Sequence, residues 1–176
     1  GIVHGAGVNR PQRCEHAEFD ATAREVAIKV NGFAYQVAAC DPANLKAIVA
    51  MTSVIGVTGM QGNSWYGYAN ETLDLALRRL SLPHCTKIAI AFSVWSEVGT
   101  GARLGADRAL QSHGIDPVSP KQGAERFVQI MGYQHPDQQV IVMSRMGRAE
   151  VFIGDVDKGV VEARQCSINF IDKVTQ

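Results

Sequence analysis

Residues 46–80 read KAIVAMTSVIGVTGMQGNSWYGYANETLDLALRRL, and this stretch contains the alternation that predicts the fold. Its start, residues 46–54, is a short apolar run, which is typical of a parallel strand buried on both faces. A Gly-rich segment follows at 53–70, and we expect it to be a loop. Leucines then recur at helical spacing, namely Leu73, Leu77 and Leu80. The stretch therefore predicts a strand, a loop and a helix.

Similar patterns lie on both sides of this stretch. Further strand-like runs occupy residues 1–4, 87–95 and 139–143, and helix-like patterns occupy residues 18–38 and 119–131. The last helix has a clear start, because Ser119 precedes Pro120 and Gln122 stands three positions after the serine. The order β-α-β-α-β-α-β predicts an α/β fold, with a parallel sheet covered by helices on both faces.

The helix predicted at 18–38 carries apolar side chains three and four positions apart, which is the period of an amphipathic helix. These side chains are Phe19, Ala23, Val26, Val30, Phe33 and Val37. Residues 145–176 lose the alternation and contain only two further strand candidates, at 151–153 and 168–174. We interpret this last part as a tail or connector.

The composition excludes several classes of partner. A length of 176 residues suits one domain, and 17 Lys+Arg balance 17 Asp+Glu. Binding to nucleic acid or to an anionic membrane needs a basic excess, which is missing here. No run approaches the roughly 20 apolar residues of a membrane span. The chain opens without Met and without a signal-peptide pattern.

The cysteine and histidine positions do not indicate a metal site. The four cysteines form no CxxC pair, and the five histidines form no HxxxH or HExxH pattern. Scattered single cysteines are typical of a reducing compartment, which favours a cytoplasmic location. We therefore expect no bound metal.

Two other catalytic patterns are weakly supported. Residues 99–105, GTGARLG, follow a strand and resemble a phosphate-binding turn, but their spacing is GxGxxxG instead of GxGxxG. A flexible active-site loop explains these glycines equally well. No serine lies in a GxSxG pattern, so a hydrolase nucleophile is not indicated.

The more informative candidates follow the carboxyl ends of the predicted strands, where parallel α/β sheets bind ligands. Ser53 ends one strand, Tyr66 stands thirteen positions later, and Asn70 follows four positions after the tyrosine. Lys29 borders the apolar stripe of its helix and has room to turn toward the same rim. A neighbouring ammonium lowers the pKa of a tyrosine from its usual value of ~10, which suits proton transfer. By spacing alone, a solvated lysine, a turn serine and a half-buried tyrosine are the simpler interpretation.

Four ordered segments make the chain resemble a known family. They are GIVHGAGV at 1–8, KVNG at 29–32, the Ser-Tyr-Asn stretch at 53–70 with Gln61-Gly62, and AFSVWSEVGTG at 91–101; residues 114–120, GIDPVSP, add a typical lead-in to the last helix. Together they resemble the ketoreductase domain of modular type I polyketide synthases, within the short-chain dehydrogenase/reductase superfamily. The resemblance spans about residues 1–145.

The resemblance implies a reaction and a role for each site residue. The substrate would be a β-ketoacyl thioester carried by an acyl carrier protein, and the hydride would come from NADPH. Tyr66 would protonate the carbonyl oxygen, and Ser53 would orient it. Lys29 would lower the pKa of the tyrosine and position the cofactor's ribose. Asn70 occupies the position where simpler short-chain reductases have their lysine.

The resemblance also implies where the cofactor lies and how the domain is organised. The loop Gly5, Ala6 and Gly7, together with Lys29, would contact NADPH. Residues 1–145 would form the C-terminal part of a Rossmann-like catalytic domain, without the family's N-terminal nucleotide-binding βαβ units. That segment would come from the same or another polypeptide, so we expect the isolated chain to be inactive. Residues 146–176 would be a tail or linker toward a following domain.

Two residue patterns that indicate the product's stereochemistry in this family are absent from this chain. Asn9, Arg10 and Pro11 stand where B-type members carry Leu-Asp-Asp, and Thr58 stands where A-type members carry Trp. The configuration of the alcohol is therefore undetermined. One alternative from another class remains open, namely a catalytically silent ketoreductase-like module that serves as a structural part of a megasynthase.

Overall fold

The structure is a computed structural model that describes residues 1–105, 116–133 and 139–144. Its strands are β1 (Ile2–His4), β2 (Ala47–Ser53), β3 (Thr86–Phe92) and β4 (Gln139–Val142). Its helices are α1 (Phe19–Ala38), α2 (Ile55–Thr58), α3 (Ser64–Arg79), α4 (Gly99–Arg103) and α6 (Pro120–Gly132), with 3₁₀ turns at Cys14–His16 and Pro42–Asn44. The predicted order of strands and main helices is confirmed.

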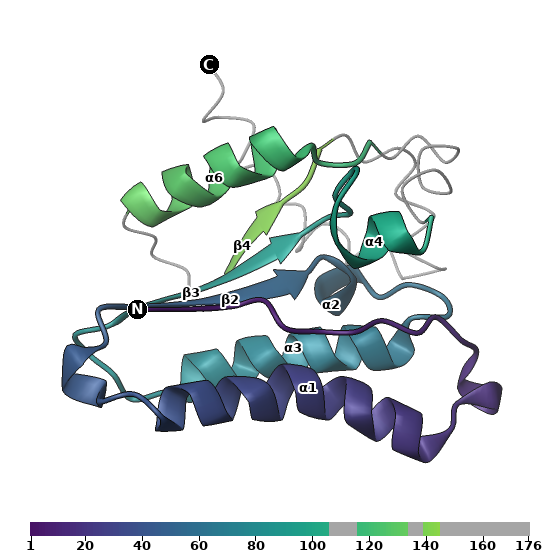
Figure 1. Ribbon diagram of the computed structural model, residues 1–176, viewed down its shortest axis with the longest axis horizontal. Coiled ribbons are helices and arrows are strands. Elements are labelled where there is room, and N and C mark those ends of the chain that lie inside the picture. Colours follow the sequence, from purple (N-terminus) through teal and green to yellow (C-terminus); the bar gives the residue numbers. More distant parts are fainter. Residues whose placement is uncertain (106–115, 134–138, 145–176) are drawn as a thin grey trace, which may run out of the picture.

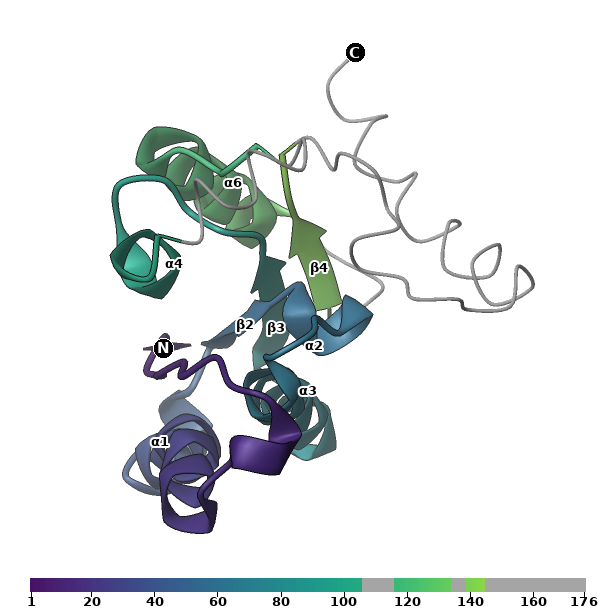
Figure 2. The ribbon, with the colours of Figure 1, turned by 90° about the vertical axis from the view of Figure 1, so that its right-hand side faces the viewer.

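The four strands form one parallel sheet in the order β1-β2-β3-β4. Helices α1 and α3 lie side by side against one face of the sheet, and α6 lies against the other (Figures 1 and 2). The predicted Rossmann-like α/β fold is therefore confirmed.

Strand alternation divides the core into two clusters, one on each face of the sheet. The cluster beneath α1 and α3 contains Phe33, Ile48, Ala50, Leu73 and Leu77, together with Ile2, Leu45, Cys85 and Ala89. The cluster beneath α6 contains Val49, Ile88, Ile90, Phe92, Ile130 and Val142. Because both faces of β2 and β3 are buried, these strands read as continuous apolar runs.

Helix α6 begins as the sequence predicts. Ser119 Oγ accepts a hydrogen bond from the Gln122 backbone N–H at 3.2 Å, and the Gln122 side chain accepts one from the Ser119 backbone N–H. This reciprocal capping box satisfies N–H groups that the first helical turn leaves unpaired.

The structure corrects the prediction of a continuous loop at 53–70. A one-turn helix, α2, starts two residues after β2, and α3 begins at Ser64, six residues before the predicted start of the helix. Tyr66 and Asn70 therefore lie in the first two turns of a helix. Only residues 59–63 remain as a connection, and both of its glycines, Gly59 and Gly62, have positive φ.

The apolar stripe predicted for α1 coincides only in part with the buried face of this helix. Phe33 is buried, but Phe19 is 81% exposed. The buried residues of α1 are Thr22, Glu25, Lys29 and Phe33. The helix is thus rotated relative to the predicted stripe, and its N-terminal half places polar side chains toward the sheet.

The strand candidates at 151–153 and 168–174, and the proposed boundary between residues 145 and 146, lie outside the described residues. Within the described ranges, no helix is long and apolar enough to cross a membrane.

Candidate functional site

The carboxyl ends of the strands form the rim where the predicted site residues gather, and Figure 2 looks onto this rim. Strand β2 ends at Ser53, whose side chain is buried. The Ile55 backbone N–H donates to Ser53 Oγ at 3.2 Å. This bond ties the serine to the start of α2 and leaves its hydroxyl hydrogen available for another acceptor.

Tyr66 and Asn70 lie one turn apart on α3, so both face the same side of the helix. The Asn70 side chain is almost fully buried, and its Nδ2 donates to the Tyr66 carbonyl oxygen at 2.7 Å. A Cβ placed on Gly56 of α2 would lie 3.0 Å from Asn70 Cβ. Because glycine allows this close approach, α2 holds the end of β2 against the start of α3.

Ser53 and Asn70 lie beside the Tyr66 side chain, and the interactions of their side chains with it lower the pKa of its hydroxyl. Burial has a larger effect in the opposite direction, so the pKa of Tyr66 is raised overall. The carboxylate of Glu25 raises it further. The structure thus brings together the predicted serine, tyrosine and asparagine, and it keeps the tyrosine protonated. The lowering of this pKa by Lys29 remains a prediction.

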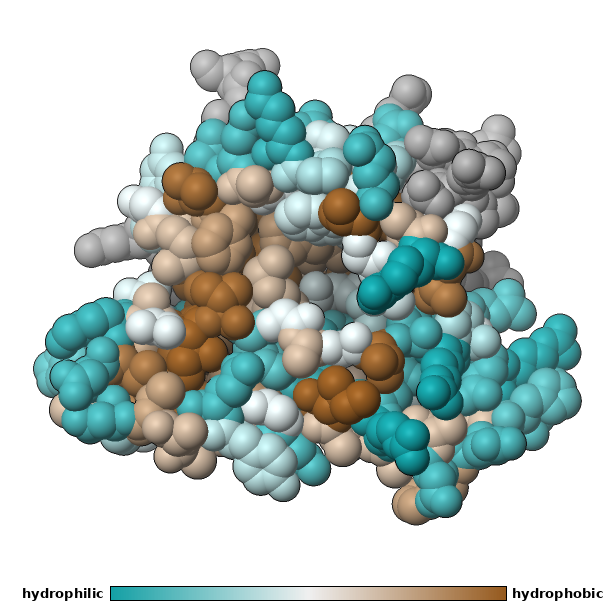
Figure 3. All heavy atoms as spheres, in the orientation of Figure 1, coloured by the Kyte–Doolittle hydropathy of each residue, from teal (hydrophilic) through white to brown (hydrophobic). Residues whose placement is uncertain are grey.

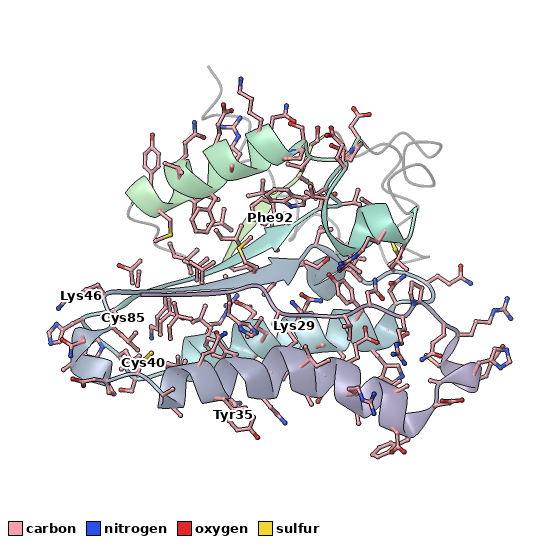
Figure 4. All side chains as sticks on the ribbon, viewed as in Figure 1. Lys29, Tyr35, Cys40, Lys46, Cys85 and Phe92 are labelled. Atoms are coloured by element: carbon pink, nitrogen blue, oxygen red, sulfur yellow. The ribbon has the colours of Figure 1, made fainter. Side chains whose placement is uncertain are left out.

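Lys29 turns inward from α1 into the layer between the helix and the sheet (Figure 4). The residue is 4% exposed, and its Nζ donates to the Met51 carbonyl oxygen at 3.1 Å. Burial lowers the pKa of its amine to about 8. His4 Nε2 donates to the Lys29 carbonyl oxygen at 2.8 Å, which fixes this turn of α1 beneath β1.

The predicted cofactor loop lies beside this lysine. A Cβ on Gly7 would lie 3.0 Å from Lys29 Cε and 3.3 Å from Nζ, so the backbone passes close to the amine. Gly5 and Ala6 are exposed at the end of β1. An open backbone segment beside a buried amine fits a ligand with hydroxyl or phosphate groups, as a nicotinamide cofactor has. Within the described residues, no hydrogen bond joins Lys29 Nζ to the Tyr66 hydroxyl.

Sequence reasoning missed some polar groups in this layer. Glu25 is buried one turn before Lys29, and Thr52 is buried one residue before Ser53. The Glu25 Oε1, Thr52 Oγ1 and Asn70 Oδ1 atoms are buried without a hydrogen-bond partner. The available signal for Glu25 was its i, i+4 spacing to the lysine, which places both on one helical face.

The glycine-rich segment at 99–105 contains α4, a helix of only five residues. The described residues contain no group of three or more His, Cys, Asp or Glu that could hold a metal ion.

Comparisons with known proteins agree with this geometry. The family model described as "KR domain" matches residues 1–97. Polyketide synthase GfsB of Streptomyces halstedii is 30% identical over 138 residues, which are 77% of this chain and 2% of that protein. One component of the polyunsaturated fatty acid synthase of Thraustochytrium sp. is 31% identical over 134 residues, which are 74% of this chain and 5% of that protein.

Solved structures show the same fold. A ketoreductase domain from the bacillaene assembly line has a TM-score of 0.66 at 25% identity, covering 81% of this chain and 36% of that chain. An alcohol dehydrogenase from Thermococcus sibiricus, complexed with 5-hydroxy-NADP, has a TM-score of 0.65 at 12% identity, covering 84% of this chain and 64% of that one, and shows the fold alone.

A parallel sheet with a serine, a tyrosine and an asparagine at its carboxyl rim defines an α/β protein with a Rossmann-like fold. Within that class, the chain belongs to the KR domain family, the ketoreductase domains of polyketide synthases. The chain spans 2% to 5% of the length of the two curated relatives above and about a third of the bacillaene ketoreductase chain.

Proposed function

We propose that this chain is the catalytic part of a ketoreductase that converts a carrier-protein-bound β-ketoacyl thioester to the β-hydroxyacyl thioester. The observation that carries this proposal is the placement of buried Ser53 at the carboxyl end of β2 and of Tyr66 and Asn70 in the first turns of α3, with Asn70 bonded to the Tyr66 carbonyl oxygen. Its relatives include a polyketide synthase and a polyunsaturated fatty acid synthase, which supports the class of substrate.

The described side chains supply the groups that a carbonyl reduction needs. Tyr66 keeps its proton at neutral pH, because its pKa is raised, and it donates that proton to the carbonyl oxygen. When the substrate is bound, Ser53 would donate its hydroxyl hydrogen to this oxygen in place of Tyr66, while its Oγ keeps accepting from the Ile55 N–H. The two donors stabilise the negative charge that develops on the oxygen. Asn70 holds the first turns of α3 in place.

NADPH would supply the hydride that adds to the carbonyl carbon. Lys29 and the loop of Gly5, Ala6 and Gly7 are the residues that would hold it, because the loop backbone lies against the buried amine. With a pKa of about 8, the amine is mostly protonated at neutral pH and favours the phenolate that forms on Tyr66.

The edge of the sheet at β1 supports the proposal that a further segment completes the cofactor site. Among the described strands, β1 pairs only with β2, and Val3 is 59% exposed. Figure 3 shows apolar surface on this side of the molecule, between α6 and the helices below the sheet. A further parallel strand with its helix would pair with and cover this edge.

We accordingly expect residues 1–176 alone to bind NADPH weakly and to be inactive, and residues 146–176 to act as a tail or linker after a catalytic part at 1–145. A location in the cytoplasm stays part of this proposal. Calorimetry showing tight NADPH binding by residues 1–176 would contradict the first expectation.

Measuring NADPH oxidation with a β-ketoacyl thioester tests the function in the polypeptide that carries this chain. Tyr66→Phe is expected to lower kcat by roughly 10²–10⁴-fold, since it removes the proton donor. Tyr68→Phe is the matched control, because Tyr68 is an exposed tyrosine two positions further along α3; it should keep the wild-type rate.

Equal rates for wild type and Tyr66→Phe would contradict the assigned role of the tyrosine. If the wild type folds but does not oxidise NADPH with such thioesters, the alternative of a catalytically silent structural module is favoured.

A further inference from the structure

Two segments outside the helices and strands meet at the rim of the sheet. One is the loop after β1, at residues 5–13, and the other is the connection between α2 and α3. Two hydrogen bonds join them. Asn9 Nδ2 donates to Asn63 Oδ1 at 2.9 Å, and the Gln12 backbone N–H donates to the Gly62 carbonyl oxygen at 2.8 Å.

The bond between the two asparagine side chains has a fixed direction. The Asn63 amide nitrogen also donates to the Gln61 carbonyl oxygen, at 3.3 Å. A carbonyl oxygen only accepts, so the side-chain oxygen of Asn63 must face Asn9, and Asn9 must be the donor. Among the described residues, Asn9 Oδ1 is buried without a hydrogen-bond partner. An unpaired buried oxygen offsets much of what the bond contributes to stability, so the pair points to a role in geometry.

Asn63 occupies the N-cap position of α3, where an asparagine side chain usually accepts from a backbone N–H of the first helical turn. Here it makes no such bond and reaches Asn9 instead. The connection that leads to Asn63 contains two glycines with positive φ, Gly59 and Gly62, which leave its backbone conformationally permissive. The start of α3 therefore depends on the loop after β1 for its position.

The loop after β1 links the two helices that carry site residues. At one side, the Gly7 backbone lies close to the amine of Lys29 on α1. Two residues further along the loop, Asn9 is bonded to Asn63, which precedes Tyr66 of α3 by three residues. The lysine and the helical turn of the tyrosine are therefore connected through this loop.

We propose that Asn9 is a positioning residue that fixes the first turn of α3, and with it Tyr66, against the cofactor loop at residues 5–7. Reduction needs the tyrosine and the cofactor to meet the same carbonyl group, and a displacement of about 1 Å can lower the rate of such a step by about 10²-fold. This inference rests on the proposed function, in which Tyr66 is the proton donor and the loop contacts NADPH.

The direction of the bond allows a test with two matched substitutions. Asn9→Asp keeps the shape of the side chain but replaces the N–H donor with an acceptor that faces the Asn63 oxygen. If Asn63 turned its amide to donate instead, its oxygen would face the Gln61 carbonyl oxygen. Asn63→Asp keeps the acceptor for Asn9 and puts a carboxylate at the N-terminus of α3, where negative charge is favourable.

The two substitutions should therefore differ in turnover, measured in the polypeptide that carries this chain. Asn9→Asp should lower kcat by roughly 10- to 100-fold, because the tyrosine is displaced from the cofactor loop. Asn63→Asp should keep most of the wild-type kcat. Wild-type kcat in folded Asn9→Asp, or equal losses in Asn9→Asp and Asn63→Asp, would overturn the inference.

Asn44→Asp is the control for an amide donor lost away from the site. Asn44 Nδ2 donates to Asp41 Oδ2 at 2.7 Å in the exposed 3₁₀ turn before β2. This variant should leave kcat and KM unchanged. Thermal melts of all three variants separate a loss of folded protein from a loss of kcat per folded molecule.

Hydrogen exchange followed by NMR gives a readout without turnover. The two reporters are the Gln12 N–H, which donates to the Gly62 carbonyl oxygen, and the Gly67 N–H, which donates to the Asn63 carbonyl oxygen at 2.8 Å. Both should exchange about fivefold faster in Asn9→Asp, the effect of losing one hydrogen bond, and at the wild-type rate in Asn63→Asp.

The two readouts distinguish failure of the inference from failure of the proposed function. A wild type that does not oxidise NADPH would contradict the proposed function, and the exchange rates would still decide whether Asn9 holds the start of α3. An active wild type whose exchange rates and kcat are unchanged by Asn9→Asp would overturn the inference alone.

Discussion

The layer between the sheet and helices α1 and α3 has two halves that differ in chemistry. Away from the rim, Phe33, Ile48, Leu73 and Leu77 form an apolar core with almost no exposed surface. Toward the rim, the same helices and strand bury Glu25, Lys29, Thr52 and Asn70, and three of these four have an atom without a hydrogen-bond partner. Figure 4 shows Lys29 in the layer of α1 and α3, and Phe92 on the other face of the sheet, beneath α6.

One pair of helices thus serves both stability and chemistry. The apolar half contributes the favourable burial, at about 25 cal/mol per Å² of apolar surface. Burying the charged and hydrogen-bonding groups of the polar half lowers the stability. The pKa values of these groups shift because burial removes their water. Mutations in the two halves are therefore expected to change stability in opposite directions.

The largest effect is expected in the apolar half. Leu77→Ala should lower the free energy of unfolding by about 2–5 kcal/mol, because it removes a fully buried side chain and leaves a cavity. Urea denaturation measures this change. Leu75→Ala, on the exposed side of α3, is the control and should cost less than about 0.5 kcal/mol beyond helix propensity. Equal losses would mean that the Leu77 half of the layer is not the stabilising core.

An effect of opposite sign is expected for the buried amine. Lys29→Met should raise the free energy of unfolding by about 1–3 kcal/mol at pH 7, since burial lowers the pKa of the amine to about 8. The loss of the bond to the Met51 carbonyl oxygen offsets part of this gain.

The difference in the free energy of unfolding between Lys29→Met and the wild type should depend on pH. The unfolded chain binds more protons at Lys29 between pH 8 and the unfolded value of ~10.4, so wild-type stability rises with pH in that window. The advantage of Lys29→Met should therefore shrink above pH 8. Lys46→Met, at an exposed lysine, is the control variant. A constant difference from pH 7 to pH 10 would refute the burial of a charged amine.

The smallest effect is expected at Thr52. Its Oγ1 is buried without a partner, and valine has nearly the same shape. Thr52→Val should therefore be neutral or stabilising by up to about 1 kcal/mol, because no hydrogen bond is lost. The exposed Thr86→Val serves as the control. A clear destabilisation by Thr52→Val in thermal melts would show that this hydroxyl has a partner.

Much of the fold was predictable because its signals are local. Buried parallel strands such as β2 and β3 need apolar side chains on both faces, so they are recognisable from sequence. Helix α6 carries its own start signal in Ser119 and Gln122. The start of α3 was placed too late, because the glycines before Asn70 suggested a loop that ended there. The packing of Gly56 against α3 overrides that local preference.

The candidate site was only partly predictable. Ser53, Tyr66 and Asn70 follow from spacing combined with a family resemblance, and the structure brings them together. Glu25 was missed because a charged residue on an amphipathic helix normally faces water. The apolar stripe of α1 does not mark its buried face, because Phe19 in this stripe is exposed.

The alternation of strands and helices follows from local sequence alone, since hydrophobic period and capping act within a few residues. It also determined which residue types stand at the strand ends. Only the tertiary structure decided which side of α1 turns inward, because that choice depends on what β1, β2 and α3 place opposite it. Glu25 and Lys29 acquire their shifted pKa values only when the surrounding elements remove their water.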